Sequence, residues 1–98
     1  MSKETFYLSR SPRKGKKWRM SMPRYSHHHD FGDSNYDDYT IHKDETRAEN
    51  YRRRHRNDKI NDVHSPGALS WFILWSSPSL QQGIKNYEKK FNVRVVRK

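Results

Sequence analysis

The sequence contains no cysteine, which excludes disulfide bonds, thiolate nucleophiles and zinc or iron–sulfur sites built on cysteine. Large apolar side chains of the core-forming kind are also few, because Leu, Ile, Val and Phe together account for 16 of the 98 residues. Such a share is typical of chains that bury little apolar surface. No apolar run approaches the roughly 18 residues of a membrane span, and the N-terminus lacks the apolar block of a signal peptide. We therefore expect no membrane span, and a reducing compartment rather than secretion.

Aromatic residues and positive charge are what the sequence does contain. Three Trp, six Tyr and four Phe can stabilise a small core at low cost in side-chain entropy. The formal charge is +10, with 21 basic residues against 11 acidic ones. A chain of this length forms at most one small domain and rarely encloses a deep pocket. The composition therefore favours a binding or structural protein over an enzyme, with no cofactor and no small-molecule substrate.

The charges are segregated along the chain. Residues 1–24 carry eight basic residues and one acidic residue, whereas residues 25–50 carry seven acidic and two basic residues. Basic residues outnumber acidic ones again in residues 51–98. The acidic segment either folds back onto the basic ends or leaves those ends free for an anionic partner, and the pattern is compatible with both.

The first part of the chain predicts β-structure. Residues 5–8 and 18–22 are extended in character, and the turn-forming Ser, Pro and Gly of residues 11–15 lie between them. We therefore expect an antiparallel hairpin with a basic tip, followed by a short strand at residues 27–31 and a loop at 33–39. This gives two parts, which are a basic arm with the first strand and turn (1–16) and a single small α+β domain (17–98).

Three helices are predicted in the rest of the chain. Asp44 is a good N-cap for a helix from Glu45 to about Asn57. The pairs Ser65-Pro66 and Ser77-Pro78 each place a capping residue before a proline, which predicts helices over residues 67–75 and 79–91. Valines at the C-terminus suit a closing strand. We expect these side chains to be buried together: Trp71, Leu74, Trp75, Leu80 and Ile84. The predicted class is α+β, with an N-terminal antiparallel hairpin or small sheet, about three helices and a short C-terminal strand.

The middle of the chain contains a distinctive set of spaced motifs. They are Phe31-Gly32, the string from Tyr36 to Asp44 (YDDYTIHKD), Arg47, Tyr51 and Arg54-His55, with Gly67, Trp71, Leu74-Trp75 and Pro78-Ser79-Leu80 downstream. Over about residues 17–96 the chain resembles a family of small basic proteins, of unknown function, that large nucleocytoplasmic DNA viruses encode. The resemblance implies a viral source. It implies no particular chemistry, because that family has no established activity.

The histidines are the candidates for metal binding or acid–base chemistry. His27, His28 and His29 are adjacent, and neighbours on a strand point to opposite faces, so they do not suit one metal ion. His42 and His55 are better suited to pairing with a carboxylate than to acting as a general base. The sequence also has no Gly-rich phosphate loop and no nucleophile placed beside a base. We predict neither a metal site nor a catalytic site.

Two basic clusters are the candidate partner-binding residues. Their members are Arg10, Arg13, Lys14, Lys16, Lys17, Trp18 and Arg19 in the first cluster and Arg52, Arg53, Arg54 and Arg56 in the second. Both clusters suit contacts with phosphates, or with an acidic protein surface. We expect a structural part of a large DNA virus particle: a minor capsid or cement protein that bridges viral capsid proteins through its basic arm and exposed aromatic side chains. The alternative is a nucleic-acid-binding protein that condenses or packages viral DNA. Either role predicts a location in the virion, and in the host cytoplasm or nucleus during assembly.

Overall fold

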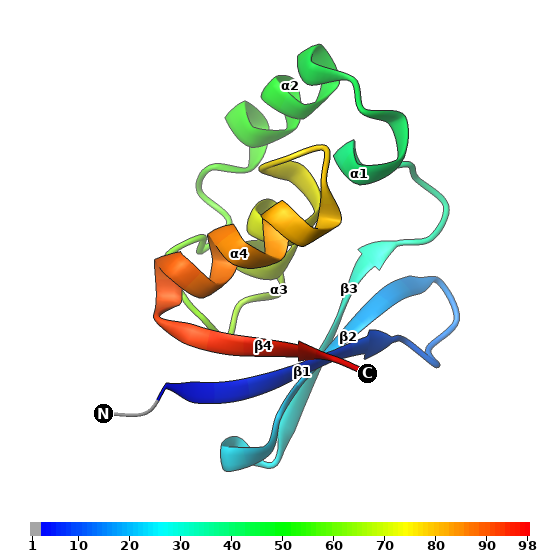
Figure 1. Ribbon diagram of the computed structural model, residues 1–98. Helices are drawn as coiled ribbons and strands as arrows, with labels where there is room; N and C mark the ends of the chain where they lie inside the picture. Colours follow the sequence, from blue (N-terminus) through cyan, green and yellow to red (C-terminus); the bar gives the residue numbers. More distant parts are fainter. Residues whose placement is uncertain (1–2) are drawn as a thin grey trace.

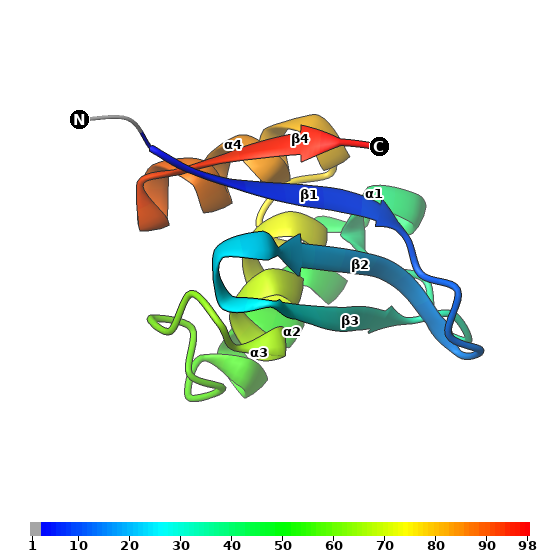
Figure 2. The ribbon, with the colours of Figure 1, turned by 90° about the horizontal axis from the view of Figure 1, so that it is seen from below.

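The computed structural model describes residues 3–98, which form a sheet with helices on one face (Figure 1). The strands are β1 (Glu4–Arg10), β2 (Lys16–Met22), β3 (His27–Asp33) and β4 (Val93–Arg97). Their order across the sheet is β3-β2-β1-β4, as Figure 2 shows from the face that no helix covers. The predicted α+β class is confirmed.

The hairpin predicted at the N-terminus is present. β1 pairs with β2 in antiparallel register, with Leu8 opposite Met20, and β2 pairs with β3 in the same sense. The buried side chains of β1 and β2 alternate with less buried ones, as expected when one face of a sheet is covered by helices. β4 runs parallel to β1 and completes a mixed sheet. β1 is thus a central strand, and it packs with the rest of the chain rather than apart from it.

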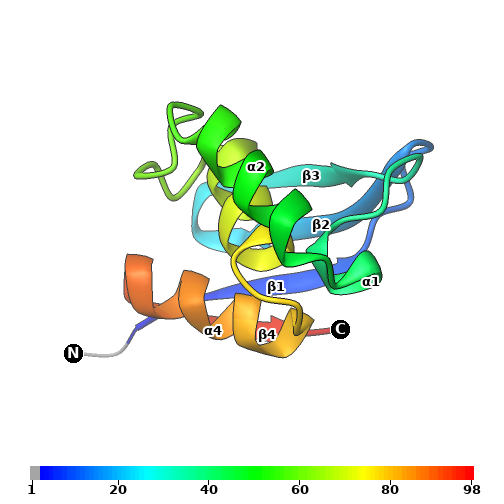
Figure 3. The same cartoon turned by 90° about the horizontal axis from the view of Figure 1, so that it is seen from above.

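The helices are α1 (Tyr39–His42), α2 (Glu45–His55), α3 (Pro66–Leu69) and α4 (Leu80–Phe91). A single 3-10 turn (Pro23–Tyr25) links β2 to β3, and a π-helical turn, η2 (Ser70–Trp75), continues α3. α2 packs against η2, which itself lies against β3, so α2 is the element farthest from the sheet (Figures 1 and 3). Across residues 3–98, no helix is long and apolar enough to cross a membrane.

Two of the predicted caps are confirmed and one is wrong. The carboxylate of Asp44 accepts hydrogen bonds from the backbone N–H groups of Thr46 and Arg47, and the Ser65 hydroxyl accepts one from Gly67. α4 starts later than Ser77-Pro78 suggested, because the hydroxyl of Ser79 caps it by accepting from the Gln82 N–H. Two further departures are α1, which begins inside a segment expected to be loop, and η2, which was expected to be ordinary helix.

The core lies between the sheet and the helices α3, η2 and α4. Of the side chains predicted to meet there, Leu74 and Ile84 are buried, and Trp75 and Leu80 pack against the cluster while partly exposed. The prediction for Trp71 is wrong, because it is half-buried and lies outside the cluster. η2 has the wider π-helical turn, which changes the side chains that share its buried face.

Candidate functional site

A groove of about 870 Å³ lies between α2, η2 and the end of the β2–β3 pair. Its lining combines basic, acidic and aromatic side chains from segments far apart in the sequence. They comprise Lys16, Lys17, Asp33, Tyr36, Asp37 and Asp38 on the sheet side, Arg47, Asn50, Tyr51, Arg53, Arg54 and His55 from α2, and Leu74 and Trp75 from η2. Its size is within the range of ordinary ligand pockets, which is about 300–1,000 Å³.

Stacked aromatic rings form part of this lining. The rings of Tyr51 and Trp75 are almost parallel, at 5°, with centroids 4.1 Å apart. The imidazole of His55 stacks on Tyr51 at the same centroid distance, with 25° between the planes. Burial raises the pKa of Tyr51 to about 12, so its hydroxyl stays protonated near neutral pH. The stack therefore gives the groove a rigid aromatic lining.

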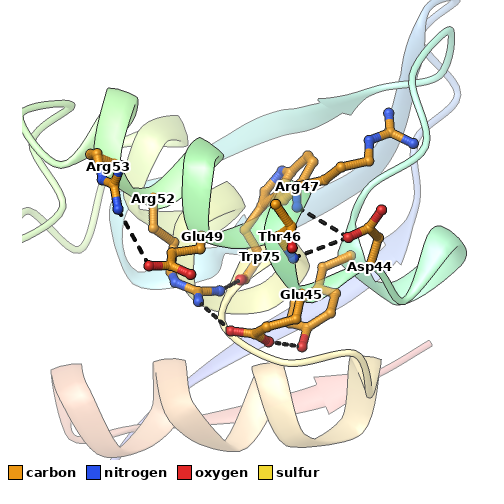
Figure 4. Close-up of polar contacts among 9 residues, drawn as sticks. Asp44, Glu45, Thr46, Arg47, Glu49, Arg52, Arg53 and Trp75 are labelled. Atoms are coloured by element: carbon orange, nitrogen blue, oxygen red, sulfur yellow. Dashed lines mark hydrogen bonds and ion pairs between the residues drawn. The ribbon is translucent and has the colours of Figure 1, made fainter.

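Three cationic side chains in the lining have no ion pair within residues 3–98: Lys16, Arg47 and Arg54. Arg47 and Arg54 are exposed and seven residues apart on α2, which places them on the same side of the helix. Figure 4 shows Arg47 extending away from the pair formed by Glu45 and Arg52. These cations are available to an anionic group in the groove.

Lys17 also lines the groove, but its charge is already neutralised. Its Nζ lies 2.7 Å from Oδ2 of Asp38 and donates to the carbonyl of Tyr36. The other oxygen of Asp38 accepts the backbone N–H of Thr40 at 2.9 Å, and so caps α1. Lys17 therefore fixes the loop that carries Tyr36, and is not free for a partner.

Arg52 is used inside the protein in a similar way (Figure 4). Nη1 donates to the carbonyl of Trp75 at 2.6 Å, and Nη2 donates to Oε1 of Glu45 at 3.1 Å. The hydroxyl of Tyr39 donates to the same carboxylate. The hydrogen bond from Tyr39, and then the one from Arg52, lowers the pKa of Glu45. This group of contacts ties α1, α2 and η2 together and holds Trp75 in place.

Arg19 is the third of the predicted partner-binding residues that is paired internally. Its guanidinium makes two hydrogen bonds to Asp30, from Nε at 2.8 Å and from Nη2 at 3.1 Å. These bonds lower the pKa of Asp30 to about 2, against an opposing effect of burial. The Arg19–Asp30 and Lys17–Asp38 pairs both join the acidic segment, residues 25–50, to the basic N-terminal segment. Of the two arrangements compatible with the sequence, these pairs therefore follow the one in which the acidic segment folds back onto the basic residues.

The remaining predicted residues lie in different places. Trp18 is buried in the core with 8% of its surface exposed, so it is not an exposed aromatic side chain. The guanidinium of Arg10 lies 5.0 Å from the centre of its ring. Arg13 and Lys14 are exposed at the hairpin turn, Arg53 pairs with Glu49 on the surface at 3.3 Å, and Arg56 is exposed at the end of α2. The structure thus brings together only Lys16, Lys17, Arg53 and Arg54 of the predicted set.

Several residues of the groove were not predicted from the sequence, among them Tyr36, Asp37, Arg47, Asn50 and Tyr51. A signal for part of this set was present, because Arg47, Asn50 and Arg54 are spaced i, i+3 and i+7, as residues on one helix face are. Nothing local to Tyr36 indicates its position, since the contact of Lys17 with that loop spans 19 residues.

A second cluster contains histidines and lies at the start of β3. The rings of His27 and His29 have centroids 4.5 Å apart, and His64 lies 6.3 Å from His29. Burial lowers the pKa of His29, and the neighbouring histidines add to the effect. Within residues 3–98, no group of three His, Cys, Asp or Glu side chains is placed to hold a metal ion.

His55 lies apart from this cluster, at the end of α2. It pairs with a carboxylate as predicted, since its Nδ1 lies 2.6 Å from Oδ2 of Asp58.

Comparison with known families gives a match across half of the chain. Residues 7–55 match the family described as "Family of unknown function (DUF5754)". The chain belongs to this family. The matched segment runs from β1 to the end of α2, so it includes all of the groove lining except the residues contributed by η2. Searches of curated proteins and of solved structures gave no match.

Proposed function

We propose that the chain is a small nucleic-acid-binding protein that contacts phosphates through the basic side of the groove. The observation that carries the proposal is the position of Lys16, Arg47 and Arg54, which line the groove beside the Tyr51–Trp75 stack without an ion pair in residues 3–98. Arginine and lysine bind phosphate through charge-assisted hydrogen bonds and through release of counterions. Aromatic rings beside such cations are typical of surfaces that bind nucleic acid.

The charge of the whole molecule supports this proposal. A net charge of +10 on 98 residues attracts a polyanion from beyond contact distance and raises the association rate. Such long-range attraction does not select one sequence over another. The proposed role is binding, and we expect the affinity of the protein for nucleic acid to depend on the salt concentration.

The identity of the nucleic acid is a finer part of the proposal. The motifs between Phe31 and Leu80 resemble small basic proteins of large nucleocytoplasmic DNA viruses, and this resemblance supports a viral genome as the partner. The capsid-cement role stays a prediction. It has less support from the arrangement of the chain, because the expected arm contributes a central strand and Trp18 is buried. Arg13 and Lys14 at the exposed hairpin turn are the residues that favour it.

A charge-matched pair of variants tests the proposal. We expect a variant with Lys16, Arg47 and Arg54 replaced by Ala to bind a labelled oligonucleotide at least about tenfold more weakly than the parent, at low salt. In the control variant, Lys85, Lys89 and Lys90 of α4 are replaced by Ala. They are exposed and lie outside the groove, and the variant has the same net charge. Equal losses of affinity in the two variants would show that only the net charge of the protein matters, and would contradict a role for the groove.

A further inference from the structure

The size of the groove restricts the form of nucleic acid that can enter it. About 870 Å³ is the volume of a small-molecule pocket, and the aromatic lining lies inside it. In a duplex the flat faces of the bases are covered by their neighbours in the stack, so they are not available to aromatic side chains. In a single strand the base faces are exposed and stack on such side chains readily. The groove therefore suits unpaired nucleotides.

Tyr36 lines the groove, and its side chain lies outside the hydrophobic core. It is 68% exposed, the largest exposed fraction among the large hydrophobic side chains of residues 3–98. Its backbone is nevertheless held, because its carbonyl accepts a hydrogen bond from Lys17 Nζ and its N–H donates to the carbonyl of Asp33. A ring that is exposed on a fixed backbone loses little conformational freedom when a flat ligand stacks on it.

The charges in the groove orient such a ligand. Asp33 and Asp37 line the sheet side, whereas Arg47 and Arg54 lie on α2. The third aspartate, Asp38, is neutralised by Lys17. The sheet side also carries one unpaired cation, Lys16, but Asp33 and Asp37 outnumber it, so this side has a net negative charge. The phosphates nearest to the base are therefore attracted to the more positive α2 side, and the base points toward the carboxylates. Carboxylates accept hydrogen bonds, and the amino group of cytosine donates them, whereas thymine has carbonyl oxygen in the same position.

We infer that the groove binds an unpaired nucleotide with an amino-bearing base, which stacks on Tyr36 and faces Asp37, while phosphates of the same strand contact Arg47 and Arg54. This inference rests on the proposed function and makes it more specific, because it names single strands as the preferred partner. It also assigns to the acidic residues of the groove a role in choosing the base.

The experiment measures binding by fluorescence anisotropy with the full chain and three labelled probes of about 12 nucleotides: oligo-dC, oligo-dT and a mixed-sequence duplex. We expect oligo-dC to bind most tightly. Tyr36→Ala is expected to weaken oligo-dC binding about tenfold, which is the usual scale for loss of one stacked base. It is expected to leave duplex binding unchanged. Asp37→Asn is expected to reduce the preference for oligo-dC over oligo-dT.

The control is Tyr25→Ala, which removes another exposed tyrosine at a position outside the groove and is expected to bind like the parent. Equal affinity for single strand and duplex, or unchanged binding in Tyr36→Ala, would overturn the inference and leave the proposed function standing. Equal binding of oligo-dC and oligo-dT would overturn the placement of the base against Asp37. Absence of binding to all three probes would overturn the proposed function itself. Displacement of oligo-dC by a poly-glutamate peptide of equal charge, at equal concentration, would show that the groove recognises acidic chains in general and would overturn the inference.

Discussion

The indole ring of Trp75 lies flat against the phenol ring of Tyr51, with 4.1 Å between the ring centroids. This contact joins α2 to η2, and η2 in turn packs against α4 and the sheet. The carbonyl of the same Trp75 accepts a hydrogen bond from Arg52, which lies one residue after Tyr51. α2 contributes only Ala48 as a fully buried side chain, so these two contacts are central to how it is held.

The first prediction concerns this stack. Tyr51→Ala removes a largely buried ring together with its stacking contact on Trp75, and we expect the free energy of unfolding to fall by about 2–4 kcal/mol. Tyr51→Phe keeps the ring and is expected to change the free energy of unfolding by less than about 1 kcal/mol. Denaturant unfolding followed by circular dichroism measures both. A loss in Tyr51→Phe as large as in Tyr51→Ala would show that the hydroxyl, and not the stack, holds α2.

The second prediction concerns the close approach of α4 to η2. A Cβ atom at Gly83 would lie 2.3 Å from the carbonyl oxygen of Ile73 and 2.8 Å from that of Phe72. Helix propensity alone would make Gly83→Ala stabilising by about 1 kcal/mol. We expect instead a loss of about 1–3 kcal/mol, because backbone atoms have to move.

The matched control for Gly83 is Gln81→Ala, an exposed position on the same helix. We expect this change to lie within about 0.5 kcal/mol of the parent. Thermal unfolding compares the two variants. A higher midpoint for Gly83→Ala than for the parent would mean that α4 and η2 are farther apart than described.

The third prediction concerns stability at acid pH. The pKa of His29 lies below its ordinary value of 6.5, chiefly because of burial, with further contributions from His27, His64 and His28, while Asp62 opposes the shift. As the pH falls below about 6.5, the unfolded chain therefore binds a proton at this site before the folded chain does. We expect the midpoint of thermal unfolding to decrease between about pH 7 and pH 5.

Two variants test whether His29 causes this dependence of the unfolding midpoint on pH. His29→Gln is expected to reduce the decrease in the unfolding midpoint, because it removes the half-buried titrating group. His28→Gln changes an exposed residue that points to the opposite face of β3, and we expect it to behave like the parent. The assignment is refuted when the two variants show the same dependence on pH.

Much of the fold was predictable from local signals, and the failures share a cause. Asp44 and Ser65 cap helices as their sequence context indicated, because a cap needs only backbone groups two or three residues away. The π-helical form of η2 instead reflects its packing against other elements, and no residue pattern in 70–75 specifies it. The parallel pairing of β1 with β4 joins the two ends of the chain, so it depends on the complete fold.

The candidate site was less predictable than the fold. A basic residue looks the same in sequence whether it is free or paired, and the pairing of Lys17 with Asp38 spans 21 residues. Likewise, Arg52 donates to a carbonyl 23 residues away, which only the packing of α2 on η2 brings within reach. The sequence therefore predicted cationic clusters but not which members remain available. Arg47 and Arg54 emerge as available because their helix face opens into the groove.

The dependence of single-strand binding on salt tests the central claim most directly. For single-stranded DNA, the logarithm of the affinity falls with the logarithm of the salt concentration, with a slope of about −0.7 for each phosphate neutralised. If Lys16, Arg47 and Arg54 each contact a phosphate, replacing all three by Ala should make the slope less steep by about two units between about 50 and 200 mM salt. The control with Lys85, Lys89 and Lys90 replaced should keep the slope of the parent. An unchanged slope in the groove variant, or an equal change in both variants, would contradict the proposal that the groove is the nucleic-acid-binding site.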